Sequence, residues 1–147
     1  MTEAELLHDD YLDYAPIPGS VPLARRRTTR LITEWGYPHL AGDAALVVSE
    51  LATNALLHGS LRDRLIRVRL TVTATTLRVE VSDPCGERLP EPRTADDADQ
   101  FGRGLLLVAA LADQWGCDPR IVGKTVYAEW VLAPARVEGN RLVGAKE

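Results

Sequence analysis

Three polar residues recur at intervals of four along an otherwise apolar segment, and their chemical types suit work on phosphates. Glu50, Asn54 and His58 would lie within roughly 80° of one another, because a helix turns about 100° per residue. An amide oxygen from Asn54 can ligate Mg²⁺, which usually keeps several waters and phosphate oxygens. Glu50, one turn earlier, could orient or deprotonate an attacking hydroxyl or water. His58, one turn later, would lie nearer the phosphates or the sugar of a nucleotide.

The apolar residues of this segment predict a helix that buries one face beside the polar stripe. They occupy the adjacent sector of the helix and comprise Ala44, Val48, Leu51, Ala52, Ala55 and Leu56. The stripe would then border a cleft, which favours phosphoryl transfer or hydrolysis. An ordinary structural role stays open, since Glu and Asn on a helix are usually solvated and a His before a glycine often caps a helix end.

Asp83 follows an apolar strand pattern directly and opens a long polar segment. A carboxylate at the exit of a strand can accept a hydrogen bond from a buried ligand amine, such as that of adenine. The alternative is an Asp that starts a turn before Pro84. Gly86 fits either interpretation.

Gly102-Arg103-Gly104 precedes an apolar stretch that predicts a helix. Free backbone amides and the positive end of a helix dipole would make this turn an anion site, and glycines allow close approach of a phosphate. The motif is neither a Walker A loop nor a dinucleotide-binding fingerprint. A simple helix entry is the alternative. If the functional interpretation holds, Asn54 and this turn face each other across one cavity sized for a triphosphate.

The remaining patterns predict an α+β domain over residues 11–132, with loose tails at 1–10 and 133–147. Ser20 is the expected N-cap of the first helix, Gly36 its end, and Gly123-Lys124-Thr125 a turn entering the last strand. The expected elements are a strand at 11–14, helices at 21–35 and 42–58, strands at 65–73 and 77–82, a loop at 83–104, a buried helix at 105–112, and strands at 115–118 and 125–132.

Composition narrows the class of protein. A net charge of −4 in 147 residues argues against a general grip on nucleic acid, and we expect Arg25, Arg26, Arg27 and Arg30 to form a solvated face. No uninterrupted apolar run reaches the roughly 18 residues of a membrane span. Cys85 and Cys117 form no CxxC pair and indicate reduced thiols. The sequence therefore predicts a cytoplasmic protein that binds neither nucleic acid nor membrane.

Taken together, four segments resemble the GHKL ATPase/kinase superfamily in order and spacing, and within it the anti-sigma-factor serine/threonine kinases of bacteria. They are residues 49–59, 81–84, 102–108 and 123–126. The resemblance covers residues 11–132 and implies a Bergerat fold. This fold is a two-layer α/β sandwich with a mixed, mostly antiparallel sheet, helices on one face and, here, residues 84–101 as an ATP lid.

The same resemblance implies a site for ATP and Mg²⁺. Glu50 would be the catalytic base, Asn54 the Mg²⁺ ligand and His58 a neighbour of the nucleotide. Asp83 would bind the adenine amine, assisted by Thr125. The phosphates would be held by Gly102, Arg103, Gly104, Leu105 and Leu106.

One departure from the superfamily lies in the second box, which usually reads Asp-x-Gly-x-Gly. Here Asp83-Pro84-Cys85-Gly86-Glu87 has a single glycine, displaced by one position. Proteins of this kind often form homodimers, sequester a sigma factor and phosphorylate a STAS-domain antagonist. Two alternatives stay open: a non-catalytic module whose lid closes on ATP to change partner affinity, and an interaction domain with no ligand.

Overall fold

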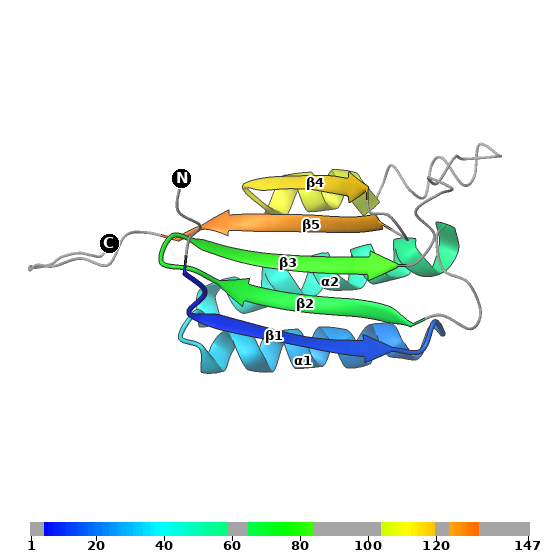
Figure 1. The fold of residues 1–147 in the computed structure, drawn as a ribbon, viewed down its shortest axis with the longest axis horizontal. Coiled ribbons are helices and arrows are strands. Elements are labelled where there is room, and N and C mark those ends of the chain that lie inside the picture. The colour runs from blue at the N-terminus through cyan, green and yellow to red at the C-terminus, as the bar shows by residue number, and fades with distance from the viewer. Residues whose placement is uncertain (1–4, 59–64, 84–103, 120–123, 133–147) are drawn as a thin grey trace, which may run out of the picture.

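A computed structural model describes residues 5–58, 65–83, 104–119 and 124–132, which form a sheet covered on one side by helices (Figure 1). The five strands lie in the order β1-β2-β3-β5-β4. Their bounds are β1 His8–Tyr14, β2 Ile66–Val72, β3 Thr76–Asp83, β4 Gln114–Pro119 and β5 Lys124–Val131. All four strand pairs are antiparallel, so the expected α+β architecture is confirmed without the parallel pair that a mixed sheet would need.

The helical layer consists of α1 (Ser20–Glu34), α2 (Pro38–His58) and a shorter helix at 104–111. α2 contacts α1 on one side and both β2 and β3 on the other. By length and composition, Pro38–Leu57 could cross a membrane, but 56% of its most apolar window is buried inside this fold. α2 is therefore a core helix.

Alternation along the strands separates the two faces of the sheet. On β3, Leu77, Val79 and Val81 are at most 2% exposed and pack beneath α2, whereas Arg78 and Glu80 lie on the uncovered face. Each fully buried aliphatic side chain of this kind contributes about 1.5–3 kcal/mol through the hydrophobic effect. This burial fixes the register of β3 and decides which of its residues can reach the helical layer.

α1 ends as the sequence predicts, but it does not begin as predicted. Gly36 has φ +100°, a conformation that favours glycine, and the chain turns there into α2 four residues earlier than predicted. The predicted N-cap is wrong. Gly19 holds that position, while the Ser20 hydroxyl donates to the carbonyl of Ala15 at 2.7 Å.

β1 begins at His8, so His8, Asp9 and Asp10 belong to the sheet rather than to the predicted tail. The acidic side chains of this edge strand are paired with arginines: Asp9 with Arg69, and Asp10 with Arg27. Arg27 therefore does not belong to a purely solvated face. Hydrogen bonding to Arg69 lowers the pKa of Asp9.

The helix at 104–111 was expected to be buried all round, and this is wrong. Val108 is fully buried, but Leu106 is 71% exposed, because the helix packs through one face only. Its C-terminal end is held by the Trp130 indole, which donates to the carbonyl of Leu111 at 2.8 Å. This hydrogen bond ties the helix to β5 and so positions its other end, at Gly104.

The core predicts a large and local stability difference between two leucines. We expect Leu77→Ala to lower the free energy of unfolding by about 2–5 kcal/mol, since Leu77 is 0% exposed and its removal leaves a cavity. Leu65→Ala is the matched control, because Leu65 is 56% exposed, and its cost should stay within about 0.5 kcal/mol. Urea unfolding measures both values, and equal losses would contradict this assignment of the core.

Candidate functional site

α2 carries the polar stripe because its opposite face is anchored in the core. Val47, Val48 and Leu51 are at most 2% exposed, which fixes the rotation of the helix. Glu50 is then half-buried and Asn54 only 9% exposed. His58 is the last residue of α2 and Asp83 the last of β3, but their side chains lie outside the described set. Gly86, Gly102 and Arg103 also lie outside the described residues.

Gly104 is the first residue of the helix at 104–111, and it places the N-terminus of that helix against the polar stripe of α2. A Cβ atom built at Gly104 would lie 3.3 Å from both polar atoms of the Asn54 amide and 3.3 Å from Oε1 of Glu50. Few real Cβ contacts are so close. The backbone of Gly104 therefore lies beside a carboxylate and an amide that belong to two successive turns of α2.

Asn54 and Gly104 thus lie close together as predicted, but without a cavity between them, whereas Gly102 and Arg103, the rest of the predicted turn, lie outside the described residues. Between these two described residues no triphosphate-sized gap lies, because the absence of a side chain at position 104 lets the helix pack closely on α2. The cavity beside Asn54 has a volume of about 10 Å³, enough for roughly one water. Its lining comprises Leu51, Asn54, Ala55, Val81, Leu105, Lys124 and Val126.

The Asn54 amide has the property expected of a ligand-binding group. Its Nδ2 atom is buried and has no hydrogen-bond partner among the described residues. A buried polar group left unsatisfied costs about 1–3 kcal/mol, so such atoms mark places where a ligand or ion completes the bonding. The two ends of an amide can exchange by a rotation of the side chain. Asn54 therefore fits a role in which its oxygen binds a cation and its nitrogen donates to an oxygen.

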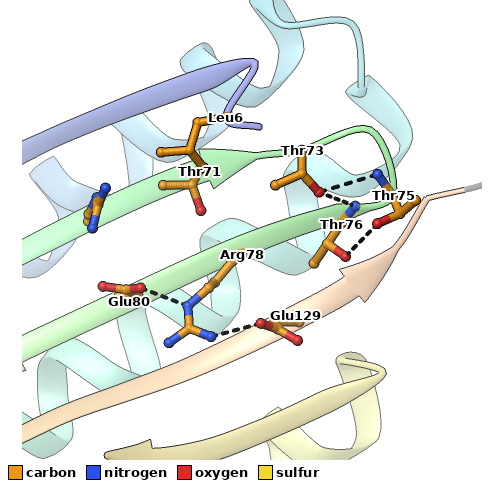
Figure 2. Close-up of a pocket in the computed structure, with 9 residues that line it drawn as sticks. Leu6, Thr71, Thr73, Thr75, Thr76, Arg78, Glu80 and Glu129 are labelled. Carbon is orange, nitrogen blue, oxygen red and sulfur yellow. Dashed lines mark hydrogen bonds and ion pairs between the residues drawn. The ribbon is translucent and has the colours of Figure 1, made fainter. Parts of the chain in front are cut away.

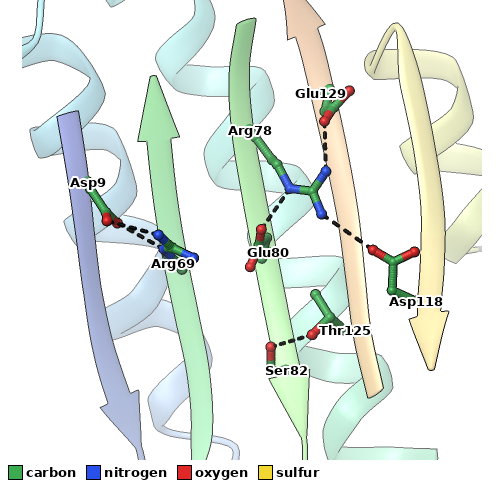
Figure 3. A network of polar contacts seen from close by, with 8 residues as sticks. All are labelled: Asp9, Arg69, Arg78, Glu80, Ser82, Asp118, Thr125 and Glu129. Atoms are coloured by element: carbon green, nitrogen blue, oxygen red, sulfur yellow. Dashed lines mark hydrogen bonds and ion pairs between the residues drawn. The ribbon is translucent and has the colours of Figure 1, made fainter. Parts of the chain in front are cut away.

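Thr125 is predicted to assist Asp83 at the adenine amine, and because the side chain of Asp83 lies outside the described set, this pairing stays a prediction. Thr125 lies on the uncovered face of the sheet, where its hydroxyl is 2.8 Å from that of Ser82 (Figure 3). Because side chains alternate along β5, the preceding Lys124 lies on the helix-facing side and lines the cavity with Asn54. Lys124 was missed because the sequence favoured a turn at 123–125, and in a turn the side chains do not alternate between the two faces of a sheet.

Of the other predicted phosphate-binding residues, Leu105 is half-buried and lines the cavity beside Asn54. Leu106 is exposed and does not belong to that lining. The side chain of Leu105 can therefore contact a ligand in this cavity, whereas Leu106 has only its backbone to offer.

The uncovered face of the sheet holds a larger hollow, of about 490 Å³, but its chemistry is already satisfied (Figure 2). Arg78 donates to Glu80 at 2.7 Å and to Glu129 at 2.8 Å. Burial opposes the charge of Arg78, but these hydrogen bonds outweigh it and raise its pKa. Figure 3 shows these residues as one network of paired charges. The unsatisfied amide of Asn54 lies on the opposite, helix-covered side, together with Glu50 and Gly104.

The fold has two layers, and the polar stripe of α2 lies beneath the N-terminus of the helix at 104–111. This arrangement defines the architecture of a GHKL-type ATPase domain. Comparison with known proteins agrees. Residues 15–130 match the Histidine kinase-like ATPase domain family, and the chain belongs to this family. The domain is therefore an ATP-binding domain. No curated protein matches the chain.

The unsatisfied amide predicts an unusual separation of stability from ligand binding. We expect Asn54→Leu to keep or raise the melting temperature of the free protein, because it removes a buried polar group without a partner. The rise in melting temperature produced by ATP and Mg²⁺ should be lost. Thr53→Val is the control, since among the described residues the Thr53 hydroxyl bonds only to the Ser49 carbonyl of its own helix. A full ATP-induced rise in Asn54→Leu would contradict this role.

The close approach of Gly104 predicts that a single methyl group disturbs the site. In Gly104→Ala the new Cβ atom would press on Asn54 and Glu50, and we expect affinity for ATP and Mg²⁺ to fall about tenfold. Gly42→Ala is the matched control, because a Cβ atom there meets nothing within 4 Å. It should leave affinity unchanged and raise stability by up to about 1 kcal/mol. Isothermal titration calorimetry measures the affinities, and equal values for both variants would contradict the contact.

Proposed function

We propose that this protein is an ATP- and Mg²⁺-dependent protein serine/threonine kinase of the anti-sigma-factor type, acting in the cytoplasm. The observation that carries the proposal is the convergence at Gly104: a carboxylate and an unsatisfied amide from adjacent turns of α2 meet the N-terminus of another helix. A helix N-terminus favours phosphate oxygens, the amide is a cation ligand and the carboxylate a proton acceptor. Phosphoryl transfer needs these three functions.

Asn54 would hold Mg²⁺ through its amide oxygen. The chemistry that the ion supplies when bound is neutralisation of charge on the phosphate oxygens. Glu50 is a half-buried carboxylate one turn earlier on the same helix. Because Asn54 would bind the ion, Glu50 remains available for the protein substrate.

Glu50 would act on the hydroxyl of a Ser or Thr in the protein substrate. The hydroxyl oxygen attacks the γ-phosphorus, a new O–P bond forms, and the bond from the γ-phosphorus to the bridging oxygen of ADP breaks. ADP leaves with the electron pair of that bond, and the hydroxyl proton passes to the Glu50 carboxylate. The reaction is therefore balanced without any further reactant.

The sequence resemblance extends this proposal to partners. A STAS-domain antagonist would be the protein substrate, and a sigma factor would be released or captured as the antagonist changes its phosphorylation state. The protein would work as a homodimer. Within the described residues, paired charges fill the uncovered sheet face near Arg78, which leaves the helix-covered site as the position for catalysis.

The kinase proposal predicts that Glu50→Gln separates binding from transfer. Phosphorylation of a STAS protein by labelled ATP should fall by about 100-fold or more, as expected for loss of a general base, while affinity for ATP stays within about twofold. Asp43→Asn is the matched control, since Asp43 is an exposed carboxylate on the same helix. Transfer at the normal rate in Glu50→Gln would exclude Glu50 as the base. ATP binding without transfer in the wild-type protein would indicate a non-catalytic switch.

A further inference from the structure

The C-terminal end of the helix at 104–111 is joined to β5 by hydrogen bonds that involve three successive strand residues. The Trp130 indole donates to the carbonyl of Leu111 at 2.8 Å, and the backbone N–H of Asp113 donates to the carbonyl of Glu129 at 2.9 Å. The backbone N–H of Val131 donates to the Asp113 carboxylate at 2.7 Å. Trp130 and Asp113 together are called the helix anchor.

The indole is the part of the helix anchor that is fixed in the core. Trp130 is 4% exposed and lies opposite Leu77 of β3, which is 0% exposed. The last carbonyls of a helix have no partner within the helix, so a donor from another element can determine where the helix ends. Because the packed indole cannot follow a moving helix, its hydrogen bond fixes the position of Leu111.

The other end of this helix is the end that meets the site. Residues 104–111 span about 12 Å, so Gly104 follows a shift or tilt that begins at Leu111. A Cβ atom at Gly104 would already lie 3.3 Å from Asn54 and Glu50, so little movement toward α2 is possible. Asn54 is 9% exposed and its Nδ2 atom has no partner among the described residues, which independently marks this end as a place for a ligand.

Trp130 itself is remote from the ligand. Lys124, the first residue of β5, lines the cavity beside Asn54. Because a strand rises about 3.3 Å per residue, the stretch from Lys124 to Trp130 is about 20 Å long. A phosphate held at Gly104 therefore does not reach the indole, and an effect of Trp130 on binding has to pass through the helix.

We propose that Trp130 is a positioning residue for the phosphates of ATP. Its hydrogen bond to Leu111 holds Gly104 in place, and binding groups must be held within about 0.5 Å of their productive position. Trp130 thus sets affinity for the phosphates and not for the adenosine part of the nucleotide.

This inference rests on the phosphate-binding role of Gly104 in the proposed function, but not on phosphoryl transfer. The two can fail separately. If Gly104→Ala left ATP affinity unchanged, the role of Gly104 would be wrong. If Gly104→Ala weakened ATP binding and removal of the indole donor did not, only the role of Trp130 would be wrong.

The test uses Trp130→Phe, which keeps an aromatic ring in the core and removes the N–H donor. Calorimetry in the presence of Mg²⁺ compares this variant with the wild-type protein for ATP, tripolyphosphate and adenosine. ATP and tripolyphosphate should each bind about tenfold more weakly to the variant, whereas affinity for adenosine should stay within about twofold. A purely structural role would not separate the phosphates from adenosine in this way.

Two variants serve as controls. Trp35→Phe makes the same exchange at the end of α1, where the Trp35 ring stacks on His8 with 4.7 Å between the ring centroids. Leu70→Ala removes a core side chain of β2 that is 2% exposed, and so lowers the melting temperature without touching the helix anchor. Both variants should keep all three affinities within about twofold of the wild-type values.

Unchanged tripolyphosphate affinity in Trp130→Phe would overturn the proposal, and so would an equal loss for adenosine. If Trp130→Phe fails to fold, Asp113→Ala tests the helix anchor at an exposed residue, and tripolyphosphate should bind about threefold more weakly with adenosine unchanged. In the wild-type protein, tripolyphosphate with Mg²⁺ should also shift the magnetic resonance of the Trp130 indole N–H, because coupling between two sites is reciprocal. Unchanged affinity in Asp113→Ala and an unshifted indole resonance would refute the coupling.

Discussion

The close packing of Gly104 on Asn54 and Glu50 is the constraint on which the arrangement of the site depends. It requires a residue without a side chain at the start of one helix and two polar residues one turn apart on another. The buried aliphatic face of α2 fixes the rotation of that helix about its axis, and the Trp130 indole holds the C-terminal end of the helix at 104–111. Neither helix can shift without breaking one of these anchors, so the polar groups meet in one place. The unsatisfied Asn54 amide is the cost of keeping that place ready for a ligand.

The sheet divides the charges of the molecule into two populations. On the uncovered face, carboxylates and guanidinium groups pair across neighbouring strands, as Asp9 does with Arg69 and Glu129 with Arg78. Beneath the helices, Asn54 and Lys124 have no such partners among the described side chains. Exposed pairs of this kind contribute little to stability. The polar groups that remain available to bind a nucleotide therefore lie under α2.

The sequence predicted the elements with strong periodicity and missed features that depend on tertiary packing. The alternation in β2 and β3 and the apolar sector of α2 were sufficient to place the helices on one face of the sheet. Serine is a common N-cap residue, but the Ser20 hydroxyl donates its hydrogen bond to the carbonyl of Ala15. No local sequence pattern predicts this contact. Thr125 and Lys124 differ by one position, and only the register with β3 shows which of them faces the helices. The motif gave the identity of the stripe on α2, whereas the 3.3 Å approach of Gly104 required the packed structure.

The most direct test of the account is paramagnetic broadening by Mn²⁺ in complex with ATP, because the effect falls steeply with distance from the ion. In nuclear magnetic resonance spectra of the labelled protein, the side-chain amide of Asn54 and the backbone amide of Gly104 should broaden first. Thr75 and Arg78, which line the hollow on the uncovered face, should stay sharp. Broadening of Thr75 and Arg78 with unchanged Asn54 and Gly104 signals would contradict the account and move the nucleotide to the other side of the sheet.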